Sequence, residues 1–267
     1  MVTPMLSKRH RHKFLELIAG PQQPCRHSCV NWYNEYMKTF AIYGAQHEKV
    51  RTTFEERGYH YNELTPDFVV SYGGDGTLLR SEAAYPSVPK LFLKNTLIGK
   101  LAQKKENDEV IEAFIAGKFS IKEVNKIEAH VNETHLIGAM EVSVHNKDPR
   151  SALRFKVKLD DEEMHHSLIG DGVIVCNTLG STAYYRSVTD SYFEIGIGLA
   201  FNNSTEQADH IVLKNDRIIT IDITRGPGAV FADNQEVTID INDGDVVRIH
   251  ESKKLMRLIR VHDHIFE

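Results

Sequence analysis

A turn with three glycines and one carboxylate holds the residues best suited to chemistry in this chain of 267 residues. It reads Tyr72-Gly73-Gly74-Asp75-Gly76-Thr77 and follows an apolar run, residues 67–71, that predicts a buried strand. The residues after the turn, 78–84, predict the opening of a helix. Backbone N–H groups in a glycine turn and at a helix N-terminus favour an anion, so this turn is typical of a phosphate site. The candidate phosphate ligands are Gly73, Gly74, Gly76 and Thr77.

Asp75 places a carboxylate inside this phosphate site. Because like charges repel, we expect Asp75 to act on a hydroxyl or a metal ion and not on phosphate itself. Phosphoryl transfer needs alignment and charge neutralisation, and a carboxylate can orient an acceptor hydroxyl and take its proton late in the transfer. The alternative is that Asp75 only caps the turn, without catalysis.

Strand and helix signals alternate in the first half of the chain. The predicted strands and helices cover residues 38–44, 46–57, 68–72, 78–84, 89–93 and 107–116, with Asn107 as a helix cap. This alternation indicates parallel βαβ units. Ligands bind at the carboxyl ends of strands in such sheets, and the glycine turn lies at such an end.

From about Ser120 the period changes to short apolar runs separated by turn signals. The predicted strands are 121–131, 136–145, 153–159, 164–168, 173–176, 211–213, 218–223, 229–232, 236–241, 246–250 and 255–261. Many short strands without helices between them indicate an antiparallel sandwich. The sequence thus predicts an N-terminal extension (1–36), an α/β phosphate-loop domain (37–119) and an all-β sandwich domain (120–267), whose last strands could return to the first domain.

Composition narrows the function classes. A net charge of -5 gives no argument for nucleic acid, and no apolar run approaches the roughly 20 residues of a membrane span. Three cysteines fit a reducing, cytoplasmic location. Cys25-Arg26-His27-Ser28-Cys29 has no second Cys/His pair at zinc-finger spacing, so no protein-held metal site is predicted, and the histidines are interpreted as surface residues.

A second motif lies in the β half. An apolar strand follows Gly170-Asp171-Gly172 and leads into Gly180-Ser181-Thr182-Ala183-Tyr184. The loop offers backbone and hydroxyl donors, and the Tyr184 ring could cover a base or a ribose. A Gly-Ser-Thr turn taken alone is commonly a helix cap.

Together the two motifs resemble the NAD kinase family over about residues 38–261, including a late Asp233-Asn234-Gln235 similar to the family's Asp-Gly-Gln turn. The resemblance implies transfer of the terminal phosphate of ATP to the 2′-hydroxyl of the adenosine ribose of NAD, with Mg²⁺, giving NADP. In that family Asp75 would match the catalytic aspartate, and Gly73, Gly74, Gly76 and Thr77 would match the phosphate loop.

The resemblance also implies a dinucleotide site in the β-sandwich domain. Asn95 matches the asparagine after the third strand, Glu141 the glutamate of an Asn-Glu pair, and Asp171 the aspartate that holds the nicotinamide end. Thr182, Ala183, Tyr184 and Ser187 match the dinucleotide-binding loop. Family members are usually homodimers or homotetramers, so a neighbouring subunit would complete the site.

The chain departs from the family pattern mainly on the acceptor side. Met140 replaces the asparagine of the Asn-Glu pair, Ile169 replaces a basic residue, and Val188-Thr189-Asp190 stands where Gly-Gly-Pro is expected. A kinase of the same fold for another nucleoside, nucleotide or lipid acceptor therefore stays open, as does a non-catalytic dinucleotide-binding protein. At single residues, the structural alternatives are a turn or cap for Asn95 and Asp171, an exposed strand residue for Glu141, and core for Tyr184.

Overall fold

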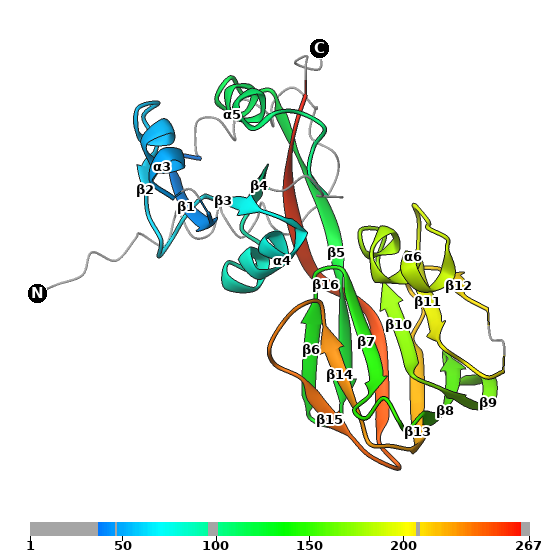
Figure 1. The fold of residues 1–267 in the computed structure, drawn as a ribbon. Coiled ribbons are helices and arrows are strands. Elements are labelled where there is room, and N and C mark those ends of the chain that lie inside the picture. Colours follow the sequence, from blue (N-terminus) through cyan, green and yellow to red (C-terminus); the bar gives the residue numbers. More distant parts are fainter. Residues whose placement is uncertain (1–36, 46, 96–100, 207–208, 263–267) are drawn as a thin grey trace, which may run out of the picture.

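The computed structural model describes residues 37–45, 47–95, 101–206 and 209–262. The N-terminal extension predicted at 1–36, with its Cys25–Cys29 motif, lies outside the described residues. Figure 1 shows an α/β part and a β part, connected by two long strands that run side by side. These strands are β5 (Phe119–Val131) and β16 (Val246–Val261), which pair in antiparallel register along most of their length.

The α/β part is built as the alternating pattern predicts. Its elements are β1 (Thr39–Gly44), α3 (His47–Glu55), β2 (His60–Tyr61), β3 (Phe68–Gly73), α4 (Asp75–Ala84), β4 (Lys90–Lys94) and α5 (Asn107–Ile115). Strand β1 pairs in parallel with β2 and β3, and β3 pairs in parallel with β4. The predicted α/β class with a parallel sheet is confirmed, and the glycine turn follows β3 as expected.

Aromatic side chains fill the core of the α/β part. Phe68 and Phe114 have ring centroids 4.7 Å apart, and Phe40 and Phe54 pack beside them at 5.1 Å from each other. Ile259 and Val261, from the last strand, belong to the same cluster. The C-terminal strand therefore completes a core that is otherwise formed by the first half of the chain.

The β part consists of two packed sheets. Its other elements are β6 (Thr134–Gly138), β7 (Glu141–Asn146), β8 (Leu153–Leu159), β9 (Glu162–Gly170), β10 (Gly172–Cys176), η1 (Gly180–Thr182), α6 (Tyr184–Thr189), β11 (Ile197–Asn202), β12 (Ile211–Leu213), β13 (Ile219–Arg225), β14 (Gly228–Ala232) and β15 (Ile239–Ile241). One sheet runs in the order β12-β11-β10-β7-β14-β15, and the other continues the α/β sheet through β16, β13, β8 and β9. Alternate residues of β5 and β16, such as Ile127 and Ile249, share one buried cluster with Val142 of β7. The predicted sandwich is confirmed.

Three local predictions are wrong, and contacts between distant residues explain the first and the third. Residues 136–145 form two strands, because the backbone N–H groups of residues 139–141 turn aside to donate to one carboxylate, Asp233. Residues 246–250 and 255–261 form one strand with a register shift between them. Asn107 is not the cap of α5: Glu106 holds that position, and the Asn107 amide exchanges two hydrogen bonds with the backbone of Lys94.

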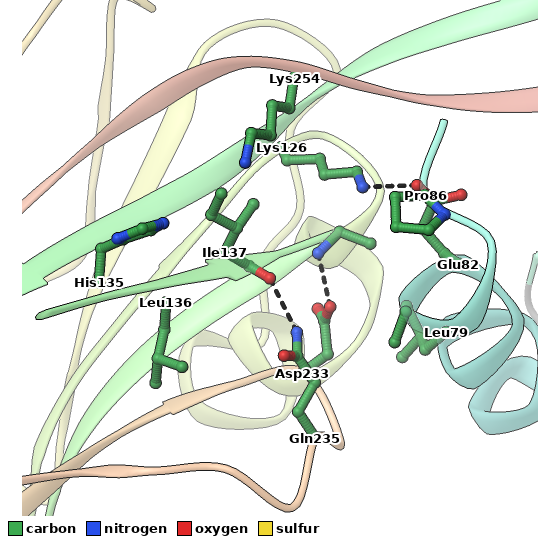
Figure 2. A pocket seen from close by; sticks show the side chains of 12 residues that line it. Leu79, Glu82, Pro86, Lys126, His135, Leu136, Ile137, Asp233, Gln235 and Lys254 are labelled. Atoms are coloured by element: carbon green, nitrogen blue, oxygen red, sulfur yellow. Dashed lines mark hydrogen bonds and ion pairs between the residues drawn. The ribbon is translucent and has the colours of Figure 1, made fainter. Parts of the chain in front are cut away.

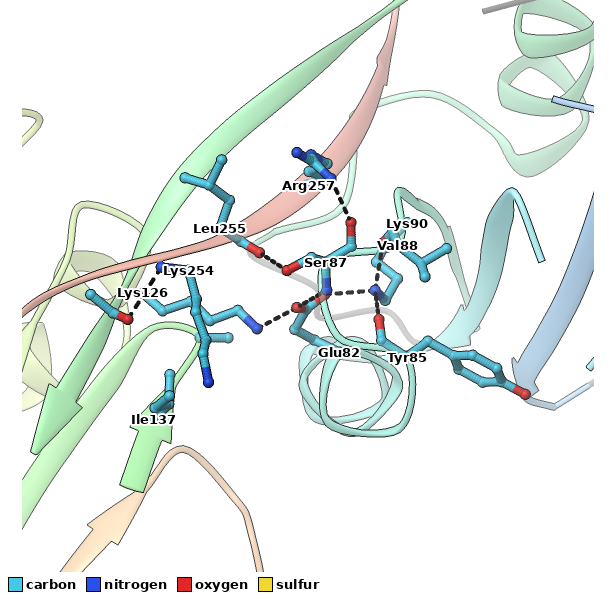
Figure 3. A network of polar contacts seen from close by, with 12 residues as sticks. Glu82, Tyr85, Ser87, Val88, Lys90, Lys126, Ile137, Lys254, Leu255 and Arg257 are labelled. Atoms are coloured by element: carbon cyan, nitrogen blue, oxygen red, sulfur yellow. Dashed lines mark hydrogen bonds and ion pairs between the residues drawn. The ribbon is translucent and has the colours of Figure 1, made fainter. Parts of the chain in front are cut away.

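A buried ion network fixes α4 against the sheets (Figure 3). Glu82 of α4 accepts from Lys90 Nζ at 2.6 Å and from Lys126 Nζ at 2.5 Å. The Lys90 and Glu82 side chains are 0% and 2% exposed. Lys90 Nζ also donates to two backbone carbonyls of the loop between α4 and β4, at 2.7 and 2.6 Å. Two ammonium groups thus share one carboxylate, which leaves a net positive charge away from water.

Burial lowers the pKa of Lys90 to about 8 from 10.5, against the opposing effect of Glu82. Between these pH values the unfolded chain binds more protons than the folded chain, so stability rises as pH rises from 8 to 10.5. We expect the free energy of unfolding of the native chain, relative to Lys90→Met, to increase by at most about 3 kcal/mol across this window. Urea unfolding at several pH values measures it. Lys94→Met, which removes a half-exposed lysine of the same strand, is the control. If the difference in free energy of unfolding between the native chain and Lys90→Met is the same at pH 8 and pH 10.5, the expectation is wrong.

Candidate functional site

The glycine turn passes directly from strand to helix. Strand β3 ends at Gly73, Gly74 has extended backbone angles as the N-cap of α4, and Asp75 is the first helical residue. No side chain caps this helix; the N–H groups of Thr77 and Leu78 donate to Gly74 O instead. A Cβ atom on Gly73 would lie 2.3 Å from Thr77 Oγ1, so glycine is required there for space. The predicted phosphate loop is therefore a helix N-terminus that no side chain caps.

Asp75 is half-buried in the first turn of α4, where a carboxylate interacts favourably with the helix dipole. Its Oδ1 atom accepts a hydrogen bond from Leu101 N at 3.2 Å. The backbone of Asn95 donates to Gly73 O at 3.0 Å, which holds the end of β4 beside the turn, and the Asn95 side chain is exposed. Asp75 and Asn95 thus both lie at the carboxyl edge of the parallel sheet.

The turn after β14 ties the β part to the glycine turn. Asn234 Nδ2 donates to Gly76 O at 3.0 Å. The neighbouring Asp233 has a left-handed backbone, with φ at 47°, and its carboxylate accepts from the backbone N–H groups of residues 139, 140 and 141 at 2.5, 2.9 and 3.1 Å. Two adjacent residues therefore connect the glycine turn to the start of β7, where Glu141 lies.

Glu141 is a mostly buried carboxyl group beside a second one. Burial, and next the charge of Asp233, raise the pKa of Glu141 to about 7. The Glu141 Oε2 atom is buried without a hydrogen-bond partner among the described residues. Burial also raises the pKa of Asp233, although its three backbone bonds oppose this. An unpartnered buried carboxyl oxygen is costly unless a ligand supplies a donor, so Glu141 is suited to bind a hydroxyl or amine.

Because the pKa of Glu141 is higher in the folded chain, the folded chain binds more protons than the unfolded chain between pH 4.5 and 7. Stability therefore falls as pH rises through that window. We expect Glu141→Gln to raise the free energy of unfolding by about 1 to 3 kcal/mol at pH 8 and by much less at pH 5. Urea unfolding at the two pH values measures this. Glu133→Gln, in the exposed turn before β6, should show no such difference, and an equal effect of Glu141→Gln at both pH values would refute the assignment.

Tyr184 and Asp171 lie on the β7, β10 and β11 side of the site. The Tyr184 hydroxyl accepts from Asn202 Nδ2 at 3.0 Å. Burial raises the pKa of Tyr184, and the carboxylates of Glu141 and Asp171 add to this, so the three side chains share one environment. The two oxygens of Asp171 accept from the amides of Asn146 and Asn203 at 3.3 and 3.2 Å. The structure therefore brings Glu141, Asp171 and Tyr184 together.

The hydroxyls of the predicted dinucleotide loop make local contacts. Thr182 Oγ1 donates to Leu179 O at 3.3 Å, and Ser187 Oγ donates to Tyr184 O at 2.7 Å. The backbone N–H of Ala183 donates to Gly180 O at 2.9 Å. These contacts shape η1 and α6, which carry Tyr184, and they do not join the loop to the glycine turn.

Met140 packs into the interior between the two halves of the site. Its side chain is 4% exposed and belongs to a buried cluster with Leu78 of α4 and Leu179 before η1. Because its backbone N–H is held by Asp233, the residue before Glu141 is fixed by both its backbone and its side chain. Met140 therefore holds the glycine turn, Glu141 and the second loop in one packed unit.

A cavity of about 260 Å³ opens beside this unit, between α4 and the β5–β6 face (Figure 2). Leu79 and Glu82 line it from α4, Lys126 and His135 line it from the sheet, and Asp233 closes one side. Leu79 and Glu82 lie one and two helical turns after Asp75. The helix that begins at the glycine turn therefore also forms one wall of the cavity.

Residues 140–261 match the ATP-NAD kinase C-terminal domain family. A NAD kinase of Methanothermobacter thermautotrophicus is 23% identical over 215 residues, which are 77% of this chain and 76% of that protein. A NAD kinase of Methanopyrus kandleri is 28% identical over 211 residues, or 75% of each chain. Over about three quarters of its length, the chain is therefore similar in sequence to NAD kinases. Solved structures of NAD kinase relatives have the same fold: an NAD kinase from Archaeoglobus fulgidus in complex with ATP superposes with a TM-score of 0.71 at 18% identity, covering 85% of this chain and 94% of that one. Yeast NADH kinase complexed with NADH superposes with a TM-score of 0.70 at 15% identity, covering 85% and 84%.

Two residues that hold this candidate site together were not among the sequence candidates. Asp233 and Asn234 join the glycine turn to Glu141, and the sequence signal for them was the resemblance of Asp233-Asn234-Gln235 to the family's Asp-Gly-Gln turn. Asn202 and His145 were also not predicted. The Asn202 amide donates to the Tyr184 hydroxyl, and His145 contacts the same amide. Single polar residues on β7 and β11 carry no motif that could have revealed them.

Proposed function

We propose that this protein transfers the terminal phosphate of ATP to the 2′-hydroxyl of the adenosine ribose of NAD, giving NADP. The observation that carries this proposal is the chain of contacts from the glycine turn through Asn234 and Asp233 to Glu141. It supports the proposal because it connects the backbone of the glycine turn to a buried carboxyl group, one oxygen of which has no hydrogen-bond partner among the described residues, in a chain similar to NAD kinases.

In the proposed reaction, the 2′-oxygen attacks the γ-phosphorus of ATP and the bond from that phosphorus to the β–γ bridging oxygen breaks, releasing ADP. Asp75 orients the attacking hydroxyl and accepts its proton. Gly73, Gly74, Gly76 and Thr77 would bind phosphate oxygens at the start of α4, where Thr77 offers its hydroxyl because its N–H donates to Gly74 O. The rate gain comes from alignment and charge neutralisation.

The dinucleotide would lie along the β part. The Glu141 carboxyl group would bind polar groups of the adenosine end, Asp171 would hold the nicotinamide end, and the Tyr184 ring would cover a base or ribose. The backbone around Thr182, Ala183 and Ser187 would line the loop that receives it. The exposed amide of Asn95, at the end of β4, would face the same ligand.

Mg²⁺ fits the residues present at the glycine turn. This ion is usually held by one or two carboxylates together with substrate phosphates and water. Asp75 is a half-exposed carboxylate in the first turn of α4, within the glycine turn itself. Asp75 and the ATP phosphates would hold Mg²⁺, which would neutralise phosphate charge when bound.

Other features of the proposed enzyme follow from its relatives and composition. We propose that the enzyme is a homodimer or homotetramer. We also propose that it lies in the cytoplasm, since the low and odd number of cysteines fits a reducing compartment. We also propose residues 37–119 as the phosphate-loop domain and residues 120–267 as the dinucleotide-binding domain. Among the residues that the structure describes, every helix is too short or too polar to span a bilayer.

An ATP-consumption assay with product analysis tests the proposal. The purified chain is incubated with ATP, Mg²⁺ and, in separate reactions, NAD, NADH and a panel of nucleosides. NADP or NADPH should form, and Asp75→Asn should remove the product. If another acceptor is phosphorylated while NAD and NADH are not, the proposed acceptor is wrong.

One observation favours a different acceptor as the second candidate. Met140 stands where the family has an amide, and its side chain is buried in an apolar cluster. Because a thioether cannot donate a hydrogen bond, one contact to a dinucleotide is missing. A nucleoside or nucleotide that does not need this contact would then be the better substrate, and the same panel of acceptors decides between the two.

A further inference from the structure

Three polar side chains converge on the face of the β5–β16 pair that lies opposite the core of the β part. Glu128 of β5 lies directly opposite His250 of β16 in the antiparallel register, and His130 follows two residues after Glu128 on the same face. One ligand atom from each of the three side chains lies within 4.8 Å of the others. The intervening residues, Ile127 and Ala129, point into the core, so the three polar groups face outward by the alternation of the strand.

Neighbouring groups orient two of these side chains. His250 Nδ1 lies 2.9 Å from the carbonyl oxygen of Glu251, which favours a proton on Nδ1 and leaves the lone pair on Nε2. Ser252 Oγ donates to Glu128 Oε2 at 2.7 Å, and the other oxygen, Oε1, lies 3.2 Å from His130 Nε2. Such outer bonds, which fix the tautomer of a histidine and the rotation of a carboxylate, are typical of metal ligands.

The rings around the cluster are also ordered. The His130 ring is stacked with the His250 ring, with centroids 5.3 Å apart, and with the ring of His135 from β6 at 5.6 Å. The stacked rings therefore hold the imidazoles of His130 and His250 in fixed positions beside the Glu128 carboxylate.

We propose that Glu128, His130 and His250 form a binding site for a divalent transition-metal ion such as Zn²⁺. Imidazole nitrogen and carboxylate oxygen suit Zn²⁺, and three protein ligands leave the fourth position of a tetrahedral site open. This site is separate from Mg²⁺ bound with ATP, because hard Mg²⁺ favours oxygen ligands. His135, which also lines the cavity of Figure 2, lies opposite His130 in the β5–β6 pair.

The test is a zinc titration of the full chain in a Cys25→Ser, Cys29→Ser background, without an added histidine tag, followed by X-ray absorption at the zinc edge. The background removes the two thiols of the N-terminal segment as competing ligands. We expect one equivalent of Zn²⁺ per chain with ligand distances of about 2.0–2.2 Å, as for nitrogen and oxygen. His250→Ala and Glu128→Gln should each weaken binding at least about 10-fold, and Ser252→Ala should also weaken it.

The matched control is His60→Ala, which removes an exposed histidine of β2 in the α/β part and should leave zinc affinity unchanged. Circular dichroism of each variant shows whether it is folded. If His250→Ala does not fold, Glu128→Gln, which keeps the size of the side chain, answers the question alone. The proposal fails if the native chain binds Zn²⁺ no more tightly than Glu128→Gln, if His60→Ala weakens binding as much, or if a ligand at about 2.3 Å shows sulfur coordination.

Discussion

Replacing Asp75 by asparagine is expected to lower kcat for NAD phosphorylation by about 10²- to 10⁴-fold. The amide keeps the size of the carboxylate and can still accept the hydrogen bond from Leu101 N, so the glycine turn should keep its shape. What would be lost is the proposed base for the proton of the acceptor hydroxyl. The measurement is initial rate against NAD concentration at saturating ATP and Mg²⁺.

The KM for NAD should change little, because Asp75 is proposed to act on the reacting hydroxyl alone and the rest of the dinucleotide would bind elsewhere. Asp216→Asn makes the same chemical change at an exposed position in the turn after β12 and should keep native kcat. A variant Asp75→Asn with kcat within a few-fold of native would show that Asp75 only shapes the turn.

Replacing Glu82 by alanine should lower the free energy of unfolding by about 3 to 5 kcal/mol, the usual cost of removing one partner from a buried ion pair. Without Glu82, the ammonium groups of Lys90 and Lys126 lie together with little solvent and no compensating carboxylate. The Ser87 N–H, which donates to Glu82 at 2.8 Å, also loses its acceptor. The lowered pKa of Lys90 limits the loss, because Lys90 can release its proton.

Urea unfolding at pH 7 measures this effect, and Glu112→Ala is the matched control. Glu112 lies on α5 and forms an ion pair with Arg57 in which both side chains are largely exposed. Exposed pairs contribute about 0 to 1 kcal/mol, so Glu112→Ala should change stability little. Equal losses in the two variants would show that the buried network adds no more than a surface ion pair.

Local patterns were sufficient for the elements that the sequence placed well. A continuous apolar run such as Phe68 to Tyr72 marks a buried strand, and the spacing of Val50 and Phe54 marks a helix with one buried face. The glycine turn between β3 and α4 was found in the same way, because its composition permits few other structures. These signals lie within a few residues of one another, and so they survive in a single sequence.

The missed features depend on contacts between distant segments. The break after Gly138 is set by Asp233, about ninety residues later, and the burial of Met140 depends on α4 and the segment before η1. The strand of residues 197–202 escaped because glycine and alanine weaken an otherwise apolar run, although all but its last residue are buried. The proposed metal ligands come from strands whose register places Glu128 opposite His250, so their spacing in the sequence contains no motif.

Strand β16 has a consequence for how the chain reaches its native state during synthesis. Its residues Ile259 and Val261 complete the core around Phe40 and Phe114, whereas Val247 and Ile249 of the same strand belong to the core of the β part. Neither core is complete until this strand has left the ribosome, so the usual order, in which an N-terminal domain folds first, is not available here. A chain arrested before residue 246 should therefore be far more sensitive to protease in both halves than the full-length chain.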